Sequence, residues 1–408
     1  MKKIVVLLFC LASLSAARAV DFQIIGIKSK FLVVDTSRIR IYMQFDIRKG
    51  DAPISTAEFM DRFRLNYVLY ADYASRERFA LGNVVLDAKT VTAVGNQKMV
   101  VFDIERPKSS PLSALMLSEI NEAGTSNKAL NDLPVRFKND RMSDRLAVFD
   151  GAGRFPKLKN YATIGDTIVL KPAGNEATTA KKVFMYRYKS DFDLAASPMN
   201  MNAKNNAQKN LKVDTLVQVA ANAPIVFGRE GLYFFSEDTT QYFGIGVLVV
   251  DKRFPKITRP EKLLRPVSYV STGQEISELG AGNEAKKTLD RYWLNLMYGN
   301  SDLAKRTIKS YYYRTEEANR LFTSFKEGWK TDKGMVFMVM GAPDRVSRVK
   351  DREVWVFNSK ANYAEITFNF VRRPNQFVDD HYELVRYAEY QPIWFAMVET
   401  WRTGNVRD

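Results

Sequence analysis

Three carboxylates near the C-terminal end of the chain have the type and spacing that acid–base chemistry would need. Asp332, Asp344 and Glu353 lie in or beside turn-forming segments, so adjacent turns could bring two of them together. Glycan hydrolysis uses two such carboxyl groups about 5–10 Å apart. Carboxylates in turns more commonly accept hydrogen bonds from backbone NH groups. The sequence therefore favours structural carboxylates, with glycan chemistry as the alternative.

Other catalytic and metal-binding patterns are sparse. The chain has one His and one Cys, which argues against Ser-His-Asp and Cys-His enzymes and excludes a site with several histidines. Asp379, Asp380 and His381 are consecutive, and we expect them in a solvated loop because adjacent residues seldom converge on one ion. The sequence contains no Walker loop, zinc-ligand spacing or nucleophile elbow. We therefore expect a non-enzyme without metal or cofactor.

The charge balance is strongly basic. Lys and Arg number 61 against 46 Asp and Glu, which gives a formal net charge of +15. One short segment, the candidate basic patch, contains Arg345, Arg348, Lys350 and Arg352. A positive field attracts anionic partners over long distances. The alternative is a generally basic, solvated surface.

The N-terminus has the pattern of a secretory leader. Two lysines precede an apolar run over residues 4–14, and Ala17-Arg18-Ala19 forms an A-x-A cleavage site. We predict a signal peptide at residues 1–19 and export to the periplasm, or to the outer membrane as a peripheral protein. Cleavage would remove Cys10, so the mature chain would have no disulfide. No later apolar run reaches the ~18 residues of a membrane-spanning helix.

Export narrows the choice of partner. Nucleic acid is excluded, and the partners that remain are envelope proteins and anionic lipid or glycan surfaces.

Two long segments alternate apolar and polar residues with the period of two that half-buried strands show. Residues 20–144 contain several such runs, and residues 145–270 contain a second series. We predict one antiparallel β-sandwich-like, Ig-like domain in each segment. A short helix near residues 110–121 interrupts the first series. Residues 271–284 are rich in Gly, Ser and Glu and are predicted to form a linker.

The segment 285–408 is predicted to be an α+β domain. Apolar residues at helical spacing indicate two amphipathic helices, the second capped by Ser301 or Asp302. Residues 335–340 are uniformly apolar and are predicted to form a strand, and residues 353–357 the next one. A closing helix is predicted over residues 391–402. The fold class is therefore mainly β, with two helices on a small antiparallel sheet at the C-terminus.

A compact motif follows the second of these helices. Gly328 suits a left-handed backbone after a helix, and Trp329 could anchor that helix on the next sheet. Thr331 and Asp332 could accept hydrogen bonds from nearby backbone NH groups, and Gly334 permits a turn into the strand. Turn residues and the next strand complete the motif with Gly341, Pro343, Asp344, Glu353 and Trp355.

This arrangement resembles the GWxTD-domain family of exported, Bacteroidota-type bacterial proteins. The resemblance covers roughly residues 285–402 and includes a helical Tyr-x-x-Arg-x-x-x-Ala-Asn-x-x-Phe run from Tyr311 to Phe322. Lys333 replaces the family's usual Arg, and the Asp-Pro-Thr-Pro segment expected near 298–302 is different here. The resemblance implies no particular catalysis, so we expect the motif to build structure or to bind a partner.

The leading hypothesis is a non-catalytic cell-envelope protein. It would be a scaffold or accessory subunit of an outer-membrane assembly or secretion complex. The alternative is an envelope glycan-binding protein, or a glycan-acting enzyme that uses the carboxylates near the motif, with Trp329 and Trp355 lining its cleft.

Overall fold

The computed structural model describes residues 22–108, 110–173, 182–189, 192–203, 211–281, 284–360 and 363–406. The predicted leader lies outside these residues. The chain divides into two compact units. Among the described residues, the first unit comprises those up to Phe31 with Arg40–Ala71 and Arg76–Val135, and the second comprises Leu32–Ile39, Asp72–Ser75 and those from Arg136 onward.

The N-terminal part of the chain forms two sheets. A five-stranded sheet has the order β1-β2-β7-β6, with β3 paired to β2, and a four-stranded sheet has the order β5-β4-β8-β9. The elements are β1 (Gln23–Asp35), β2 (Arg38–Lys49), β3 (Ala52–Pro53), α1 (Thr56–Arg62), β4 (Phe63–Tyr70), β5 (Arg78–Val84), β6 (Val91–Val94), β7 (Gln97–Glu105), β8 (Ser113–Glu122) and β9 (Lys128–Arg136).

The predicted helix near residues 110–121 is wrong, because this segment forms strand β8. The strand pairs antiparallel with β4 over eight residues, from Phe63 opposite Glu122 to Tyr70 opposite Leu115. Met116 and Ile120 are buried on one of its faces. The run of Leu, Met and Ala favours a helix locally, but cross-strand pairing overrides so weak a preference.

The second unit begins with two further sheets. One has the order β10-β12-β15, and the other has the order β11-β17-β16-β13-β14, in which β11 is parallel to β17. Aliphatic and aromatic side chains of both sheets form one core, which includes Ile168, Phe227 and Phe235. The elements are α2 (Met142–Arg145), β10 (Leu146–Asp150), β11 (Tyr161–Thr163), β12 (Thr167–Pro172), β13 (Lys182–Tyr188), β14 (Val213–Ala220), β15 (Pro224–Val226), β16 (Gly231–Ser236) and β17 (Ile245–Val250).

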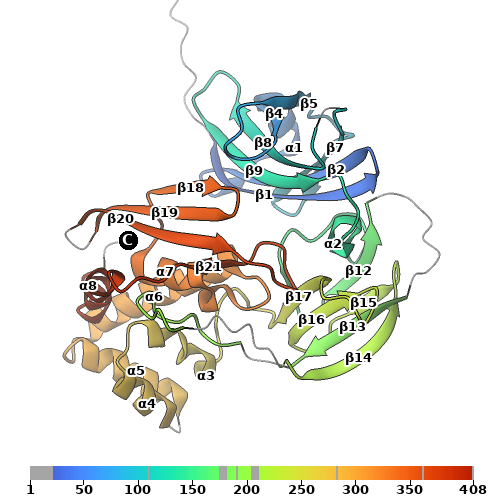
Figure 1. Ribbon diagram of the computed structural model, residues 1–408. Coiled ribbons are helices and arrows are strands. Elements are labelled where there is room, and N and C mark those ends of the chain that lie inside the picture. Colours follow the sequence, from blue (N-terminus) through green and yellow to red (C-terminus); the bar gives the residue numbers. More distant parts are fainter. Residues whose placement is uncertain are drawn as a thin grey trace, which may run out of the picture. The chain divides into compact units, whose positions relative to one another are not determined.

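Helices and a four-stranded antiparallel sheet complete the second unit. The sheet order is β18-β19-β20-β21, and α6 and α7 lie beside it while α4 and α5 lie farther away (Figure 1). The elements are α3 (Pro260–Leu263), η1 (Pro266–Tyr269), α4 (Gly273–Ala281), α5 (Ala285–Leu296), α6 (Ser301–Phe322), η2 (Gly328–Lys330), α7 (Asp332–Met340), β18 (Arg345–Val349), β19 (Arg352–Lys360), β20 (Tyr363–Arg372), β21 (Tyr382–Leu384) and α8 (Tyr390–Arg402).

The predicted fold class is confirmed: the protein is mostly β, with several antiparallel sheets and C-terminal helices. The two amphipathic helices correspond to α5 and α6, and the closing helix corresponds to α8. The cap of α6 is Asn300, whose Oδ1 accepts the NH of Leu303 at 3.0 Å, rather than Ser301 or Asp302. Helix α4 lies within the segment predicted to be a linker. None of the helices in the described residues is long and apolar enough to span a membrane.

The strand predicted over residues 335–340 is wrong, because these residues belong to helix α7. The helix is buried on every side, from Met335 to Met340, and packs with α6, α8 and β21. A helix without a solvent-facing side has no polar stripe, so its sequence cannot be distinguished from a buried strand by periodicity. Its N-terminus is fixed by the side chain of Thr331.

Candidate functional site

The motif begins where η2 crosses the last turns of α6. A Cβ at Gly328 would overlap the backbone carbonyl of Ala318, and a Cβ at Gly334 would overlap the carbonyl of Gly328. Gly328 does not have the left-handed backbone that the sequence suggested, and Gly334 lies inside α7. Both positions need glycine because backbones approach each other closely. The left-handed φ occurs later, at Gly341, where φ is 89° after the end of α7.

Trp329 is an internal anchor. Its side chain is 1% exposed. Its backbone NH donates to Asn319 Oδ1 at 3.3 Å, and its carbonyl accepts the hydroxyl of Tyr269 at 3.1 Å. The Tyr269 and Trp329 rings meet edge to face, with centroids 6.1 Å apart. Trp329 therefore joins η1 and α6 rather than presenting a ring to solvent.

The helical run from Tyr311 to Phe322 precedes the motif and attaches α6 to neighbouring segments. Tyr311 is buried and donates its hydroxyl to the carbonyl of Pro266 at 2.6 Å. Arg314 stacks over the Trp401 ring, 4.8 Å from its centroid. Asn319 donates to the carbonyl of Pro255 at 2.9 Å while it accepts from Trp329. These three side chains therefore attach α6 to three different neighbouring segments.

Thr331 accepts a hydrogen bond from a nearby backbone NH, as predicted, whereas Asp332 accepts one from a residue far away in the sequence. Thr331 Oγ1 accepts the NH of Gly334 at 3.0 Å and donates to the carbonyl of Gly328 at 2.6 Å. Asp332 Oδ2 accepts the NH of Leu384 at 2.6 Å, and Oδ1 accepts Arg386 Nη2 at 2.8 Å. Both charged side chains of this pair are buried. Asp332 therefore holds the segment after β21 against the start of α7.

Glu353 is the centre of a second buried network. Its carboxylate accepts Trp355 Nε1 at 2.6 Å and pairs with Lys333 Nζ and Arg348 Nε, each at 3.0 Å. Burial alone would raise the pKa of Glu353, but the charge of Lys333, the indole NH and Arg348 lower it below its usual range. Lys333 also lies 3.7 Å from the centroid of the Tyr382 ring. Lys333 therefore contacts both the Glu353 carboxylate and the Tyr382 ring.

The third carboxylate lies apart from these networks. Asp344 is exposed and accepts the NH of Asn358 at 2.7 Å, while its own NH donates to the carbonyl of Val356 at 2.9 Å. It sets the entry into β18, directly after Pro343. Asp332, Asp344 and Glu353 therefore each have separate structural partners.

The candidate basic patch lies on the β18–β19 hairpin, whose strand β18 is exposed along its length. Its cations are not equivalent. Arg348 is paired with buried Glu353, and Arg345 is 3.7 Å from Glu365. Lys350 occupies the turn with a φ of 29°, and neither it nor Arg352 has a carboxylate within ion-pair distance in the described residues. The freely exposed charge is therefore at the tip of the hairpin.

The consecutive Asp379, Asp380 and His381 do not gather around one point. Asp379 accepts Arg141 Nη1 at 2.9 Å and Ser143 Oγ at 3.0 Å, whereas His381 Nε2 lies 3.1 Å from Glu383. Among the described residues, no three His, Cys, Asp or Glu side chains gather as metal ligands would. Asp379 instead ties the loop after β20 to α2.

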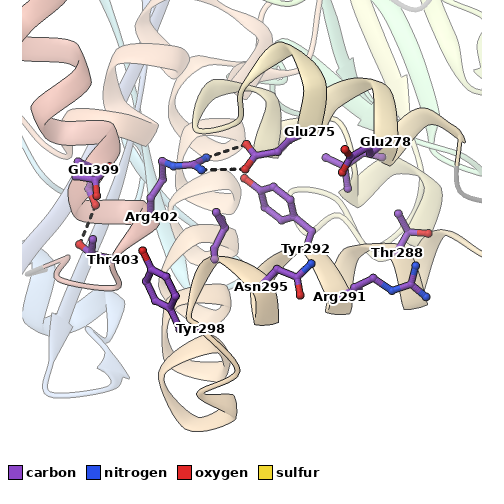
Figure 2. A pocket seen from close by; sticks show the side chains of 12 residues that line it. Glu275, Glu278, Thr288, Arg291, Tyr292, Asn295, Tyr298, Glu399, Arg402 and Thr403 are labelled. Atoms are coloured by element: carbon purple, nitrogen blue, oxygen red, sulfur yellow. Dashed lines mark hydrogen bonds and ion pairs between the residues drawn. The ribbon is translucent and has the colours of Figure 1, made fainter.

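The second unit contains clefts that the sequence did not predict, and two of them adjoin the motif domain. The first, about 540 Å³, is lined by α4, α5 and α8 (Figure 2). Arg402 closes one side of it through two hydrogen bonds to Glu275, at 2.8 and 2.9 Å. Tyr298 borders the cleft, is 95% exposed and has a φ of 51°. It begins the segment that departs from the family pattern.

The second cleft, about 830 Å³, lies between the motif and the sheet that contains β16 and β17. Its lining residues are far apart in sequence, from Arg187 to Lys330. The sequence contains two basic clusters that contribute to this cleft, one with Arg187 and Lys189 and one over Lys252–Arg265, but neither reveals which face its residues share. Tertiary structure alone brings these cations together.

Residues 231–403 match the family model of the GWxTD domain. The match begins at the first residue of β16, so the domain includes β16 and β17 as well as the helices and the four-stranded sheet. It is therefore longer at its N-terminal end than the 285–402 that the motif indicated. The chain matches none of the curated proteins.

Proposed function

We propose, from the premise that the chain carries a GWxTD domain over residues 231–403, that it is a non-catalytic scaffold or accessory subunit in an outer-membrane assembly or secretion complex. The main observation behind this proposal is that the motif side chains are used for contacts inside the domain. Trp329, Asp332 and Glu353 are buried and bonded to other parts of the domain. Motif side chains that make internal contacts of this kind build a rigid domain, and they leave its other surfaces for a partner.

Export to the envelope is part of the same proposal. The leader pattern at residues 1–19 supports it, and the β-rich organisation of the remaining chain suits a modular envelope protein. A protein without cysteine after cleavage depends on its cores alone, and the large aromatic core of the GWxTD domain is adequate for this. The bacterial envelope is thus the compartment in which we expect the protein to act.

The glycan-acting alternative requires an open cleft lined by Trp329 and Trp355. The two rings are 1% and 2% exposed, so neither offers a face on which a sugar could stack. The carboxylates near the motif are held by Arg386, Lys333 and backbone NH groups. These features favour the scaffold over the glycan-binding protein or enzyme.

Affinity purification of a tagged copy from crosslinked native envelopes tests the proposal. We expect one or more outer-membrane proteins to co-purify in fixed ratio, and an unrelated exported protein with the same tag and expression level should not recover them. Recovery of the protein alone from the soluble periplasmic fraction would overturn the scaffold function. Turnover of an isolated envelope glycan by the purified chain would establish the alternative.

A further inference from the structure

The larger cleft lies between the β-sheet part and the helical part of the second unit. Strands β16 and β17 form one wall, and η2 with the segment around α3 forms the other. Apolar groups of Phe192, Val250 and Ile257 contribute to its lining, and Trp329, which is almost fully buried, borders it. Its volume of about 830 Å³ is within the range of sites that hold a ligand of several side chains.

Positive charge exceeds negative charge in this cleft. Seven cations line it, namely Arg187, Lys189, Arg229, Lys262, Arg265, Lys326 and Lys330, against four carboxylates, namely Asp214, Glu230, Glu261 and Glu327. The difference, seven minus four, leaves a surplus of three positive charges in a partly enclosed space. A surplus of this kind attracts an anionic group from solution.

The carboxylates are largely satisfied by some of these cations. Asp214 pairs with Arg187, Glu230 pairs with Lys262 at 3.0 Å, and Glu327 pairs with Lys330 at 2.7 Å. Within the described residues, Lys189 and Arg229 have no carboxylate within ion-pair distance, and both are exposed at the cleft. These two cations are therefore available to a ligand.

Two lysines on the η2 side of the cleft, Lys326 and Lys330, lie where burial disfavours their charged form. Lys326 donates to the carbonyl of Asp193 at 3.1 Å, and no carboxylate in the described part of the chain lies within ion-pair distance of its ammonium. Burial lowers its pKa to about 8. Lys330 is buried as well, and burial lowers its pKa although Glu327 is beside it. An anionic ligand would stabilise the charged form of both lysines.

Two buried hydrogen-bond donors on the lining also favour a ligand that brings acceptors. Arg187 Nε and Trp329 Nε1 are buried, and neither meets an acceptor among the described residues. Buried donors without acceptors are uncommon in native structures and are often sites where a partner group or water belongs.

We propose that this cleft is the docking site for an acidic segment of a partner protein that also carries an apolar side chain. The proposal rests on the scaffold function and names the chemistry of its partner. Carboxylates of the segment would face Lys189, Arg229 and Lys326, and its apolar side chain would lie on the floor beside Ile257. The interleaved carboxylates of the cleft disfavour a polyanion such as a phosphorylated glycan or a lipid surface, because every repeat of such a ligand would meet like charge.

Selection from a displayed library of random peptides tests the proposal on the full chain. The counter-selection uses the double variant Lys189→Glu with Arg229→Glu, whose residues are exposed and without ion pairs in the described structure. We expect enriched peptides to carry net negative charge and at least one large apolar residue. Their affinity, measured by fluorescence anisotropy, should fall at least about tenfold in the double variant.

The matched control is Lys350→Glu with Arg352→Glu on the β18–β19 hairpin, which changes the net charge by the same amount. It should change the affinity less than about twofold, because those residues are not part of the cleft. Enrichment of neutral or basic peptides, no enrichment over the counter-selected variant, or equal loss in the control would each overturn the proposal.

Two further binding assays would show whether the cleft binds a different ligand. If replacing the apolar residue by serine leaves affinity unchanged and inorganic phosphate competes as well as the peptide does, the cleft is a simple anion site and the proposal is wrong. If phosphatidylglycerol vesicles bind through Lys189 and Arg229 and no acidic peptide does, the ligand is a lipid surface. Co-purification from envelopes can succeed while these assays fail, so failure of the cleft is distinguishable from failure of the scaffold function.

Discussion

Asp332 and Arg386, separated by 54 positions in the sequence, form an ion pair of 2.8 Å in which both side chains are almost fully buried. The same carboxylate accepts the NH of Leu384, and the same guanidinium donates to the carbonyl of Ala196 at 3.2 Å. One acidic residue of the motif therefore joins the start of α7, the end of β21 and the loop after β13. This relationship gives Asp332 a structural purpose that local sequence does not reveal.

Replacing Asp332 by Asn should destabilise the second unit by about 3 kcal/mol, because Arg386 would remain buried without its counter-charge. Urea unfolding followed by tryptophan fluorescence measures this. Asp344→Asn is the matched control. Its exposed side chain accepts one backbone NH, so it should cost about 1 kcal/mol or less. Equal stability of the two variants would show that the Asp332 pair contributes nothing special.

Alanine at Gly328 or Gly334 should prevent the correct packing of η2 on α6 and α7. The new methyl group would overlap a backbone carbonyl, which cannot move aside as a flexible side chain can. We expect a loss of about 3 kcal/mol or more, or failure to fold. Gly280→Ala in α4 is the control, since no atom lies within 4 Å of its Cβ position and alanine should stabilise the helix by about 0.5–1 kcal/mol.

The cations of the basic patch should divide into two classes by their effect on stability. Arg348→Ala removes a partner of buried Glu353 and should cost about 1–2 kcal/mol. Arg352→Ala should change stability by less than about 0.5 kcal/mol, since it has no ion pair among the described residues. Thermal unfolding of both variants distinguishes them. A neutral Arg348→Ala would mean that Lys333 and Trp355 satisfy Glu353 by themselves.

Lys326 should make stability depend on pH in the alkaline range. Burial lowers its pKa in the folded state to about 8, whereas the unfolded chain has the ordinary value near 10.5. Between these values the unfolded state binds more protons, so stability should rise as pH increases from about 8 to about 10.5. Lys326→Met should flatten this rise relative to the unmodified chain in urea titrations. An unchanged slope would place the Lys326 ammonium in solvent.

Glu353 should make stability depend on pH in the acidic range. Its pKa in the folded state lies below the ordinary value of 4.5, so its contribution is complete above that value and is lost as pH falls through the folded pKa. We expect Glu353→Gln to lower stability at neutral pH and to weaken the acid dependence below about pH 4.5. Circular dichroism during acid titration checks both effects. A variant with the same acid midpoint and the same neutral stability would exclude Glu353 as a stabilising carboxylate.

The wrong predictions share one cause. The strand over residues 335–340 and the helix near residues 110–121 are predictions from local pattern and propensity, whereas in both segments the tertiary neighbours decide the structure. The helix α7 has no polar face because other elements surround it, and β8 is held by pairing with β4. Gly328 was assigned to a left-handed turn because glycine after a helix usually has that function, although here the reason is contact with Ala318.

The mostly β fold class, the amphipathic helices and the closing helix could be predicted from the sequence, because alternation and helical spacing are local properties of the chain. The sequence also pointed to the GWxTD domain through a motif with fixed spacing. The contacts of each motif residue could not be predicted in this way, since Asp332 with Arg386 and Trp329 with Tyr269 are long-range pairs. The cationic cleft is tertiary for the same physical reason: its charges lie on separate elements, and only packing of the sheet against η2 places them around one space.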